Sequence, residues 1–434
     1  MNKKIFFVAT VAASLAVLPS CKNEVDDLFD QSAADRIEQA MTDYNEALCS
    51  AENGWEMLYF ANGDEQGYNL LCKFDKNGSV KFAAKNEFSS NNQYAEETSL
   101  YEMIADNGPV LTFNTYNKLF HIFADPNDIP STGEDDETGF GHEGDYEFVV
   151  HEATADQIFL KGKKYGISIY LRKLPADLAW EDYFAQVEAN KAKYFNAKVK
   201  TIWLETATKR YTVQDMTSGV MSFVPEGGDA VSETLYKAYI LTYDGKLHFI
   251  TPFKGIDGKI SVQNFDVAED GTLVCSDEGE TGRFYSFTPA DMFTATSYTW
   301  RIDKNAVEGS WATAYQALVD GIVAYKKSSP LQYVEFSYDS KNAVEGYPNL
   351  MTIKTKSYTL KYYFNIAVEG DNAVNITYGG TADNNSKVFY RDVPAVVDFC
   401  NALCGASTLT GNSNMAITTL VVANATGSFA VDLR

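Results

Sequence analysis

Most of this chain alternates its side chains with a period of two, which is the spacing of residues on one face of a β-strand. The alternation begins at Trp55, and Asp75-Lys76-Asn77-Gly78 stands between two such runs as a hairpin signal. Strand-like runs fall at 68–74, 79–84, 99–104, 110–115, 118–123, 146–151, 157–161 and 167–171. Short strands at regular intervals, with no helical pattern between them, predict an antiparallel sandwich or barrel.

Helical spacing replaces this pattern in four places. Ser32 caps the first predicted helix, Pro175 opens the second, and the others cover about 311–325 and 394–405. These elements predict two domains. Residues 32–175 form an N-terminal antiparallel β domain with a leading helix, and residues 176–434 form a β-rich C-terminal domain with helices. In one interpretation the second domain divides into subdomains 176–300 and 301–434.

The predicted fold class is therefore mainly β, with antiparallel sandwich- or barrel-like domains and a few punctuating α-helices. An α+β arrangement is the alternative for the C-terminal half. Aromatic residues make up 14% of the chain, most of them Tyr and Phe, and this content favours sheets because such side chains fit a half-buried pleated surface.

The first residues have the composition of an export signal. Lys3 and Lys4 precede an apolar stretch at 5–17, which is too short for a membrane-spanning helix of roughly 20 residues. Leu18-Pro19-Ser20-Cys21 follows and resembles a bacterial lipoprotein signal, in which the cysteine after the cut carries a diacylglycerol. We therefore predict a signal peptide at 1–20 and lipidation of Cys21. An ordinary secretory signal with a chance cysteine is the alternative.

An acidic segment follows the predicted anchor. Glu24, Asp26, Asp27 and Asp30 lie within residues 21–31, which we interpret as a tether. Acidic residues directly after the lipidated cysteine resemble the surface-export signals of Bacteroidota lipoproteins, whereas a plain polar linker is the alternative. The expected location is the outer membrane, attached through the lipid and exposed at the cell surface, with the periplasmic face as the alternative.

The charge of the chain excludes one class of partner. Its formal net charge is −23, and such a surface repels phosphate backbones, so we expect no nucleic-acid partner.

Five cysteines remain besides Cys21, and their scattered positions suit small buried apolar side chains better than a disulfide framework. We expect no catalytic residue and no cofactor from any motif.

Two motifs resemble known functional motifs, but the residues around them do not fit the corresponding sites. The stretch 139–144 matches a dinucleotide-binding glycine pattern, but it follows four acidic residues and precedes a predicted strand instead of a helix. His142-Glu143 and His151-Glu152 lack the second histidine, four residues after the first, that places two zinc ligands on one helical face. Neither motif supports an enzymatic assignment.

Two sets of residues remain as candidate sites. The acidic loop 125–145 offers Asp125, Asp128, Asp135 and Asp136 as calcium ligands, since calcium prefers carboxylate oxygens. A solvated insertion without bound metal is the alternative for this loop. Tyr116 and Tyr347 have loop-like contexts and are candidates for ligand binding, whereas the five tryptophans are expected in cores.

The order of features from Ser32 onward resembles a Bacteroidota lipoprotein family known as domain of unknown function 4302. The matching stretches include 51–55, 67–69, 108–117, 121–126, 144–148 and 160–164. The resemblance to this family implies neither an assigned activity nor any catalytic residues. The members resemble accessory lipoproteins encoded beside SusC/SusD-type outer-membrane uptake systems, which implies capture or presentation of a nutrient. We therefore expect a non-catalytic ligand-binding or scaffolding accessory, with a hydrolase acting on polysaccharide or peptide as the alternative.

Overall fold

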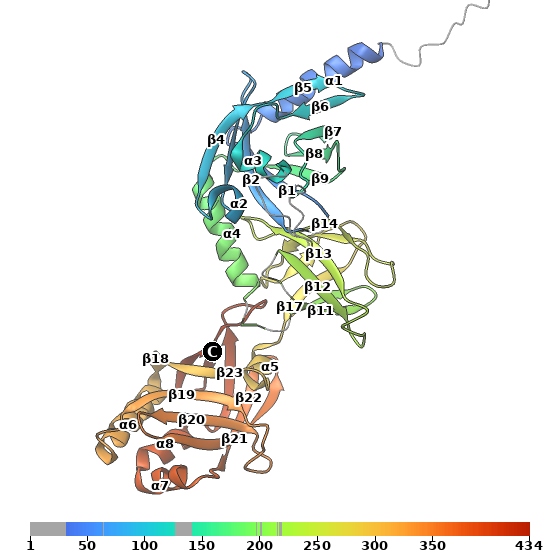
Figure 1. The fold of residues 1–434 in the computed structure, drawn as a ribbon. Helices are drawn as coiled ribbons and strands as arrows, with labels where there is room; N and C mark the ends of the chain where they lie inside the picture. Colours follow the sequence, from blue (N-terminus) through green and yellow to red (C-terminus); the bar gives the residue numbers. More distant parts are fainter. Residues whose placement is uncertain are drawn as a thin grey trace, which may run out of the picture.

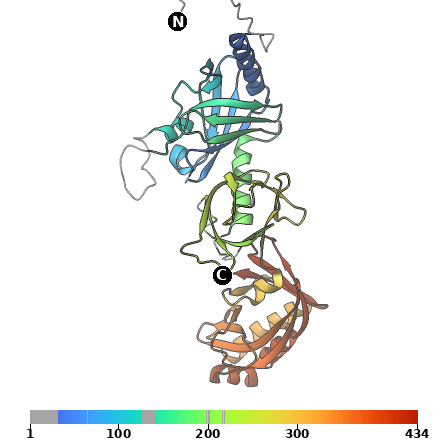
Figure 2. The same ribbon diagram turned by 90° about the vertical axis from the view of Figure 1, so that its right-hand side faces the viewer.

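Three β-sheets follow one another along the chain in the computed structural model, which describes residues 32–63, 65–125, 141–196, 198–199, 202–214, 216 and 219–434. The N-terminal helix α1 lies at the opposite end of the molecule from the third sheet in both views (Figures 1 and 2). Every strand pairing within the sheets is antiparallel, so the predicted mainly β fold is confirmed. Within the described residues, no helix combines the length and apolar character needed to cross a membrane.

The first sheet has nine strands and is open at both edges. Its order is β4 (Ala95–Leu100), β3 (Ser79–Ala84), β2 (Gly67–Phe74), β1 (Trp55–Phe60), β9 (Ser168–Lys173), β8 (Gln157–Gly162), β7 (Glu147–Ala153), β6 (Pro109–Thr112) and β5 (Glu102–Ala105). One face carries the inward side chains of these strands, such as Met57, Leu70 and Leu171, in a single buried cluster. The opposite face carries Glu56, Leu58 and the other alternate residues, and parts of it are also covered.

One long helix and three short helical segments cover the inner face of the first sheet. They are α1 (Ala33–Cys49), α2 (Glu87–Ser90), α3 (Lys118–His121) and the 3₁₀ turn η1 (Ile122–Ala124). Helix α1 begins as predicted, because the Ser32 hydroxyl accepts a hydrogen bond from the Asp35 amide at 3.2 Å. It contacts β5 and β6 (Figure 1).

The second sheet is a closed eight-stranded barrel. Its strands are β10 (Ile202–Thr206), β11 (Arg210–Gln214), β12 (Val220–Pro225), β13 (Leu235–Leu241), β14 (Leu247–Phe253), β15 (Val262–Val267), β16 (Leu273–Cys275) and β17 (Gly282–Ser286). Phe223, Phe249, Phe265 and Phe284 pack together inside it, with ring centroids of neighbours 4.9–6.5 Å apart. Helix α4 (Trp180–Tyr194) joins the first sheet to this barrel.

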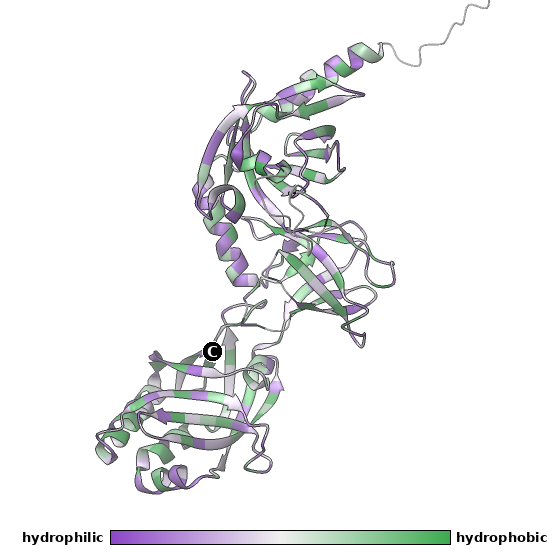
Figure 3. Ribbon diagram, viewed as in Figure 1, coloured by the Kyte–Doolittle hydropathy of each residue, from purple (hydrophilic) through white to green (hydrophobic). Residues whose placement is uncertain are grey.

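The third sheet is another closed barrel of eight strands. These are β18 (Trp300–Glu308), β19 (Leu331–Tyr338), β20 (Asn349–Thr355), β21 (Thr359–Gly370), β22 (Ala373–Gly380), β23 (Gly405–Gly411), β24 (Thr419–Ala423) and β25 (Gly427–Leu433). Its helices are α5 (Pro289–Thr294), α6 (Gly309–Tyr325), α7 (Asn384–Asp392) and α8 (Pro394–Ala402). Both hydrophilic and hydrophobic residues occur in the strands of all three sheets (Figure 3).

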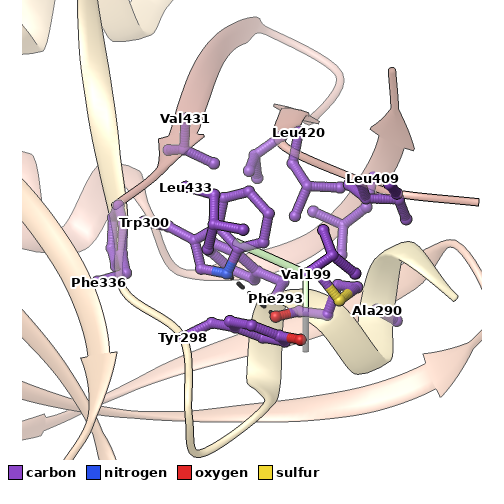
Figure 4. Close-up of a cluster of buried hydrophobic side chains, with 14 of the residues drawn as sticks. Val199, Ala290, Phe293, Tyr298, Trp300, Phe336, Leu409, Leu420, Val431 and Leu433 are labelled. Atoms are coloured by element: carbon purple, nitrogen blue, oxygen red, sulfur yellow. Dashed lines mark hydrogen bonds between the residues drawn. The ribbon is translucent and has the colours of Figure 1, made fainter. Parts of the chain in front are cut away.

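A buried cluster inside the third barrel surrounds Trp300, whose indole N–H donates to the Met292 carbonyl at 3.0 Å (Figure 4). Phe336, Leu420 and Leu433 pack around the indole, and all are at most 5% exposed. Val199 belongs to the same cluster, although it lies in the segment before β10. The leading segment of the second barrel is thus anchored in the core of the third.

The structure corrects several local predictions. Residues 118–123, predicted as a strand, form α3 and η1, because the Asn117 side chain accepts a hydrogen bond from the Leu119 amide and starts a helical turn. Helix α7 was not predicted. Four of the five tryptophans are buried as expected, but Trp203 is half-exposed on the outside of the second barrel.

Candidate site at the seam between the first sheet and the second barrel

The outer face of β1 packs against the second barrel, and we call this contact the seam. Leu58 and Phe60 of β1 meet Ala238, Ile240 and Ile250 of the barrel in one buried apolar cluster. At the start of β2, a Cβ on Gly67 would lie 2.2 Å from the Ile240 side chain, so only glycine allows this close approach. The seam therefore resembles a core contact more than a loose domain boundary.

A buried carboxylate lies beside this apolar contact. Glu56 on β1 is 0% exposed and accepts hydrogen bonds from the Arg172 Nε at 2.7 Å and the Tyr183 hydroxyl at 2.5 Å. Arg172 also reaches Asp244, in the turn between β13 and β14, with an N–O distance of 3.2 Å. Burial raises the pKa of the Glu56 carboxyl, and the Arg172 guanidinium opposes that rise. Glu56 thus joins the sheet to α4, and Arg172 joins the sheet to the barrel.

Next to the network lies a cavity of about 360 Å³, which we call the seam pocket. The sheet contributes Leu58, Gln157, Tyr170 and Arg172, and the barrel contributes Thr242, Lys246, Leu247, His248, Asn264, Phe265, Asp266 and Ser276. Small-molecule sites usually measure about 300–1,000 Å³ and combine apolar walls with a few convergent polar groups. The seam pocket has a volume in this range, and its lining is mainly polar, with Leu58, Tyr170, Leu247 and Phe265 as its apolar members.

His248 is a buried polar residue of the pocket and is 7% exposed, and Thr242 is fully buried there as well. Its Nδ1 lies 2.6 Å from the Asn264 Oδ1, while the Asn264 Nδ2 donates to Asp277 at 2.6 Å. Because the Asn264 amide is turned in this way, Nδ1 carries the proton and Nε2 presents a lone pair. Nε2 has no hydrogen-bond partner among the described residues. Burial lowers the pKa of His248 to about 4, so the ring is neutral at pH 7.

The cations of the pocket already have partners. Arg172 pairs with Glu56 and Asp244, and the Lys246 Nζ lies 3.4 Å from Asp266. Tyr170 meets the His248 ring edge to face, with centroids 5.1 Å apart. The lining thus offers an aromatic wall, polar side chains and compensated charges, an arrangement suited to holding a polar ligand.

Comparison with known proteins gives the family of the chain. The model of the family described as domain of unknown function (DUF4302) matches residues 25–269. The chain belongs to the DUF4302 family. The matched range includes the first sheet, α4 and the second barrel as far as β15, and so it contains most of the lining of the seam pocket.

Other comparisons add no functional information on this DUF4302 protein. No curated protein matches the chain. The DNA polymerase III subunit beta from Pseudomonas aeruginosa is 9% identical, covers 92% of this chain and 98% of its own, and has a TM-score of 0.11. A DNA polymerase sliding clamp from Caulobacter crescentus is 10% identical, with 90% and 96% covered and the same TM-score of 0.11. Likeness at that level carries no argument about fold or function.

Most of the predicted metal and anchor residues lie outside the described part of the DUF4302 chain. Cys21, Asp128, Asp135 and Asp136 are in this group, whereas Asp125 is described and half-buried at the end of η1. The described residues contain no group of three or more His, Cys, Asp or Glu side chains placed to hold a metal ion. Calcium binding at 125–145 and lipidation of Cys21 therefore stay predictions.

The two tyrosines predicted to bind ligand lie in different parts of the fold, one beside the first sheet and one in the third barrel. Tyr116 is 52% exposed and stacks on His121, with ring centroids 5.5 Å apart. Tyr347 precedes β20 of the third barrel and is half-buried, and its ring occupies the space beside Gly379. Neither lines the seam pocket, and their role in binding stays a prediction.

No sequence pattern indicated Arg172, Asp244 or the place of His248 in the pocket lining. One signal was present, because Glu56 is the single charged residue in the run Trp55–Phe60, whose other residues are all apolar. A strand that is apolar on both faces is buried on both sides, so its lone carboxylate needs a cation nearby. That reasoning predicts a buried ion pair, but it does not identify Arg172 as the partner.

Proposed function

We propose that this DUF4302 protein is a lipid-anchored outer-membrane protein, exposed at the cell surface, that binds a small polar ligand without transforming it. In this proposal it acts as an accessory of a nutrient-uptake system, beside an importer of the SusC/SusD type. The leader ending at Cys21 and the family membership support the location and the context. The third barrel and the helix α1 lie at opposite ends of the body, which places the seam between them (Figure 1).

The seam pocket is the observation that carries the binding role. Its lysine and arginine are held by carboxylates, and its histidine is fixed by Asn264 in one tautomer. A hydrolase needs an acid, base or nucleophile whose proton is exchanged during the reaction. The fixed and compensated groups of this pocket favour binding over such proton transfer.

Ligand binding is tested by a thermal-shift screen of the mature protein against a library of small polar metabolites. We expect at least one compound to raise the melting temperature, because a ligand that binds only the folded state stabilises it. Ser276→Trp places an indole among the lining residues and should remove that shift. Ser340→Trp is the matched control, since Ser340 is an exposed residue in a turn of the third barrel. A shift that persists in Ser276→Trp would contradict binding in the seam pocket.

The anchor is tested by Cys21→Ser in the producing bacterium. We expect the variant to leave the outer-membrane fraction, because stable attachment depends on the acyl chains and each buried methylene contributes about 0.8 kcal/mol. Fractionation, with protease added to whole cells expressing the unaltered protein, measures both attachment and surface exposure. Outer-membrane association of the serine variant equal to that of the unaltered protein would refute the anchoring part of the proposal.

A further inference from the structure

We infer that this chain has a second binding site, at one end of the first sheet, where exposed tyrosine rings pack against the sugar rings of a carbohydrate. The site consists of Tyr116, Tyr146 and Tyr165 with a cavity that the last two line, and we call it the tyrosine platform. None of the three tyrosines is among the described residues that line the seam pocket, so the inference does not depend on the proposed function. Three observations support it: the accessibility of the rings, the contacts that hold them, and the polar groups beside them.

The first observation is that the three rings are open to solvent. Tyr116 is 52% exposed, Tyr146 is 47% exposed and Tyr165 is 38% exposed. They follow β6, precede β7 and lie in the turn between β8 and β9, and these positions meet at one end of the sheet because the strands are antiparallel neighbours. Tyr146 and Tyr165 both line a cavity of about 340 Å³. A ligand can therefore reach the rings directly, and gathered exposed rings of this kind mark a binding surface.

The second observation is that fixed neighbours hold the rings in place. The His121 Nδ1 accepts a hydrogen bond from the Asn117 amide at 3.0 Å, and its Nε2 donates to the Phe113 carbonyl at 2.8 Å. Because both ring nitrogens are bonded to the backbone, the imidazole has one orientation, and burial lowers its pKa, so it is neutral at pH 7. Tyr116 stacks on this imidazole with centroids 5.5 Å apart, and the centroid of Tyr146 lies 5.6 Å from it.

A buried carboxylate positions the third ring. Asp145 accepts hydrogen bonds from the backbone amides of Lys164 and Tyr165 at 2.8 and 3.0 Å. Since Asp145 directly precedes Tyr146, it fixes the turn between β8 and β9 beside the start of β7. Rings that are already held in this way lose little conformational freedom when a ligand binds, and such preorganisation favours affinity.

The third observation is the presence of charged side chains beside the rings. Lys163 and Glu147 line the cavity with an N–O distance of 3.1 Å, and both stay partly exposed. The Lys164 Nζ lies 4.5 Å from the centroid of the Tyr165 ring. The core of a protein–protein interface is depleted in lysine and glutamate, so this mixture does not resemble one.

A carbohydrate matches both kinds of group on the tyrosine platform. The C–H groups of a sugar ring pack on aromatic surface, while its hydroxyls both donate and accept hydrogen bonds and so suit the ammonium and carboxylate groups alike. Nucleic-acid bases also stack on aromatic rings, but the net charge of −23 repels the phosphates that accompany them. The platform therefore favours a carbohydrate over a nucleic acid or a protein partner.

Affinity electrophoresis of the mature protein tests this inference. The probes are soluble starch, xyloglucan, galactomannan, arabinoxylan and polygalacturonate, each cast into a native gel. We expect at least one of them to retard the protein relative to a gel without polysaccharide. This comparison requires no variant, so it gives a result even if a substitution impairs folding. Equal migration in all of the gels would contradict the inference.

Variants then assign the retardation to the rings. Tyr146→Ala combined with Tyr165→Ala should weaken the affinity for the retarding polysaccharide at least about tenfold, because aromatic side chains in a binding site carry a large share of the binding energy. Tyr146→Phe combined with Tyr165→Phe keeps the rings and should lose less affinity. Tyr236→Ala is the matched control, since Tyr236 is an exposed tyrosine of the second barrel that lines neither cavity, and it should bind as the unaltered protein does.

The outcomes separate this inference from the proposed function. Ser276→Trp changes the seam pocket but not the tyrosine platform, so we expect that variant to be retarded as the unaltered protein is. If Ser276→Trp removes the retardation and the paired alanine variant does not, the carbohydrate binds in the seam pocket, which refutes the platform and supports the proposed function. If the paired alanine variant binds as tightly as Tyr236→Ala, the rings do not form the site. If no polysaccharide retards the protein, the inference fails, while the thermal-shift screen still decides the proposed function.

Discussion

Replacing Arg172 by methionine should reduce the free energy of unfolding by about 3–5 kcal/mol at pH 7, which is the usual cost of leaving one partner of a buried ion pair uncompensated. Glu56 is 0% exposed and would keep only its hydrogen bond from Tyr183. Because burial already raises the pKa of the Glu56 carboxyl, loss of the cation should raise it further. The stability of Arg172→Met should therefore recover in part as the pH falls and Glu56 takes up a proton.

Urea unfolding of two further variants, a double variant and a control, completes this experiment. Glu56→Gln combined with Arg172→Met removes the buried charge, and it should restore most of the stability that Arg172→Met loses. Lys173→Met, at the exposed next residue, should change stability by less than about 0.5 kcal/mol. Equal losses in Arg172→Met and Lys173→Met would show that the Glu56–Arg172 pair does not hold the seam together.

The second large effect concerns pH and His248. Burial lowers the pKa of this residue to about 4 in the folded protein, against roughly 6.5 in an unfolded chain. Between these values the unfolded chain binds a proton that the folded protein does not. The resulting stabilisation is complete above about pH 6.5 and is lost as the pH falls toward 4. The loss between pH 7 and pH 4.5 should be about 2 kcal/mol.

The measurement compares the unaltered protein with His248→Phe, in which this group does not titrate. Glu56, Asp277 and all other carboxylates titrate in both proteins, so the difference between the two pH profiles isolates His248. We expect the free energy of unfolding to fall more steeply with acid in the unaltered protein. Parallel profiles between pH 7 and pH 4.5 would mean that the imidazole is solvated in the folded state.

The strands were predictable because their side chains alternate with a period of two, and the hairpin signal at 75–78 correctly joins β2 to β3. The closure of the barrels was not predictable in the same way. β10 pairs with β17, about 80 residues further along the chain, and residue patterning does not show which distant strands become neighbours. The short apolar run 118–123 was misread because a run of that length does not distinguish a strand from a helix by period alone.

The seam pocket was hidden for a related reason. Its lining comes from β1, β8, β9, β13–β16 and their turns, so residues as distant as Leu58 and Ser276 share one cavity. His248 lies within the strand β14, and nothing in its sequence context distinguishes it from a structural histidine. Its role depends on Asn264 and Asp277, which only the pairing of β14 with β15 brings beside it.

The most direct test of the proposed binding role is a crystal structure of the mature protein grown with the compound that gives the largest thermal shift. We expect that compound to lie in the seam pocket, between the lining residues of the sheet and those of the barrel. An empty seam pocket with the compound bound elsewhere, for example beside Tyr116, would contradict the binding role.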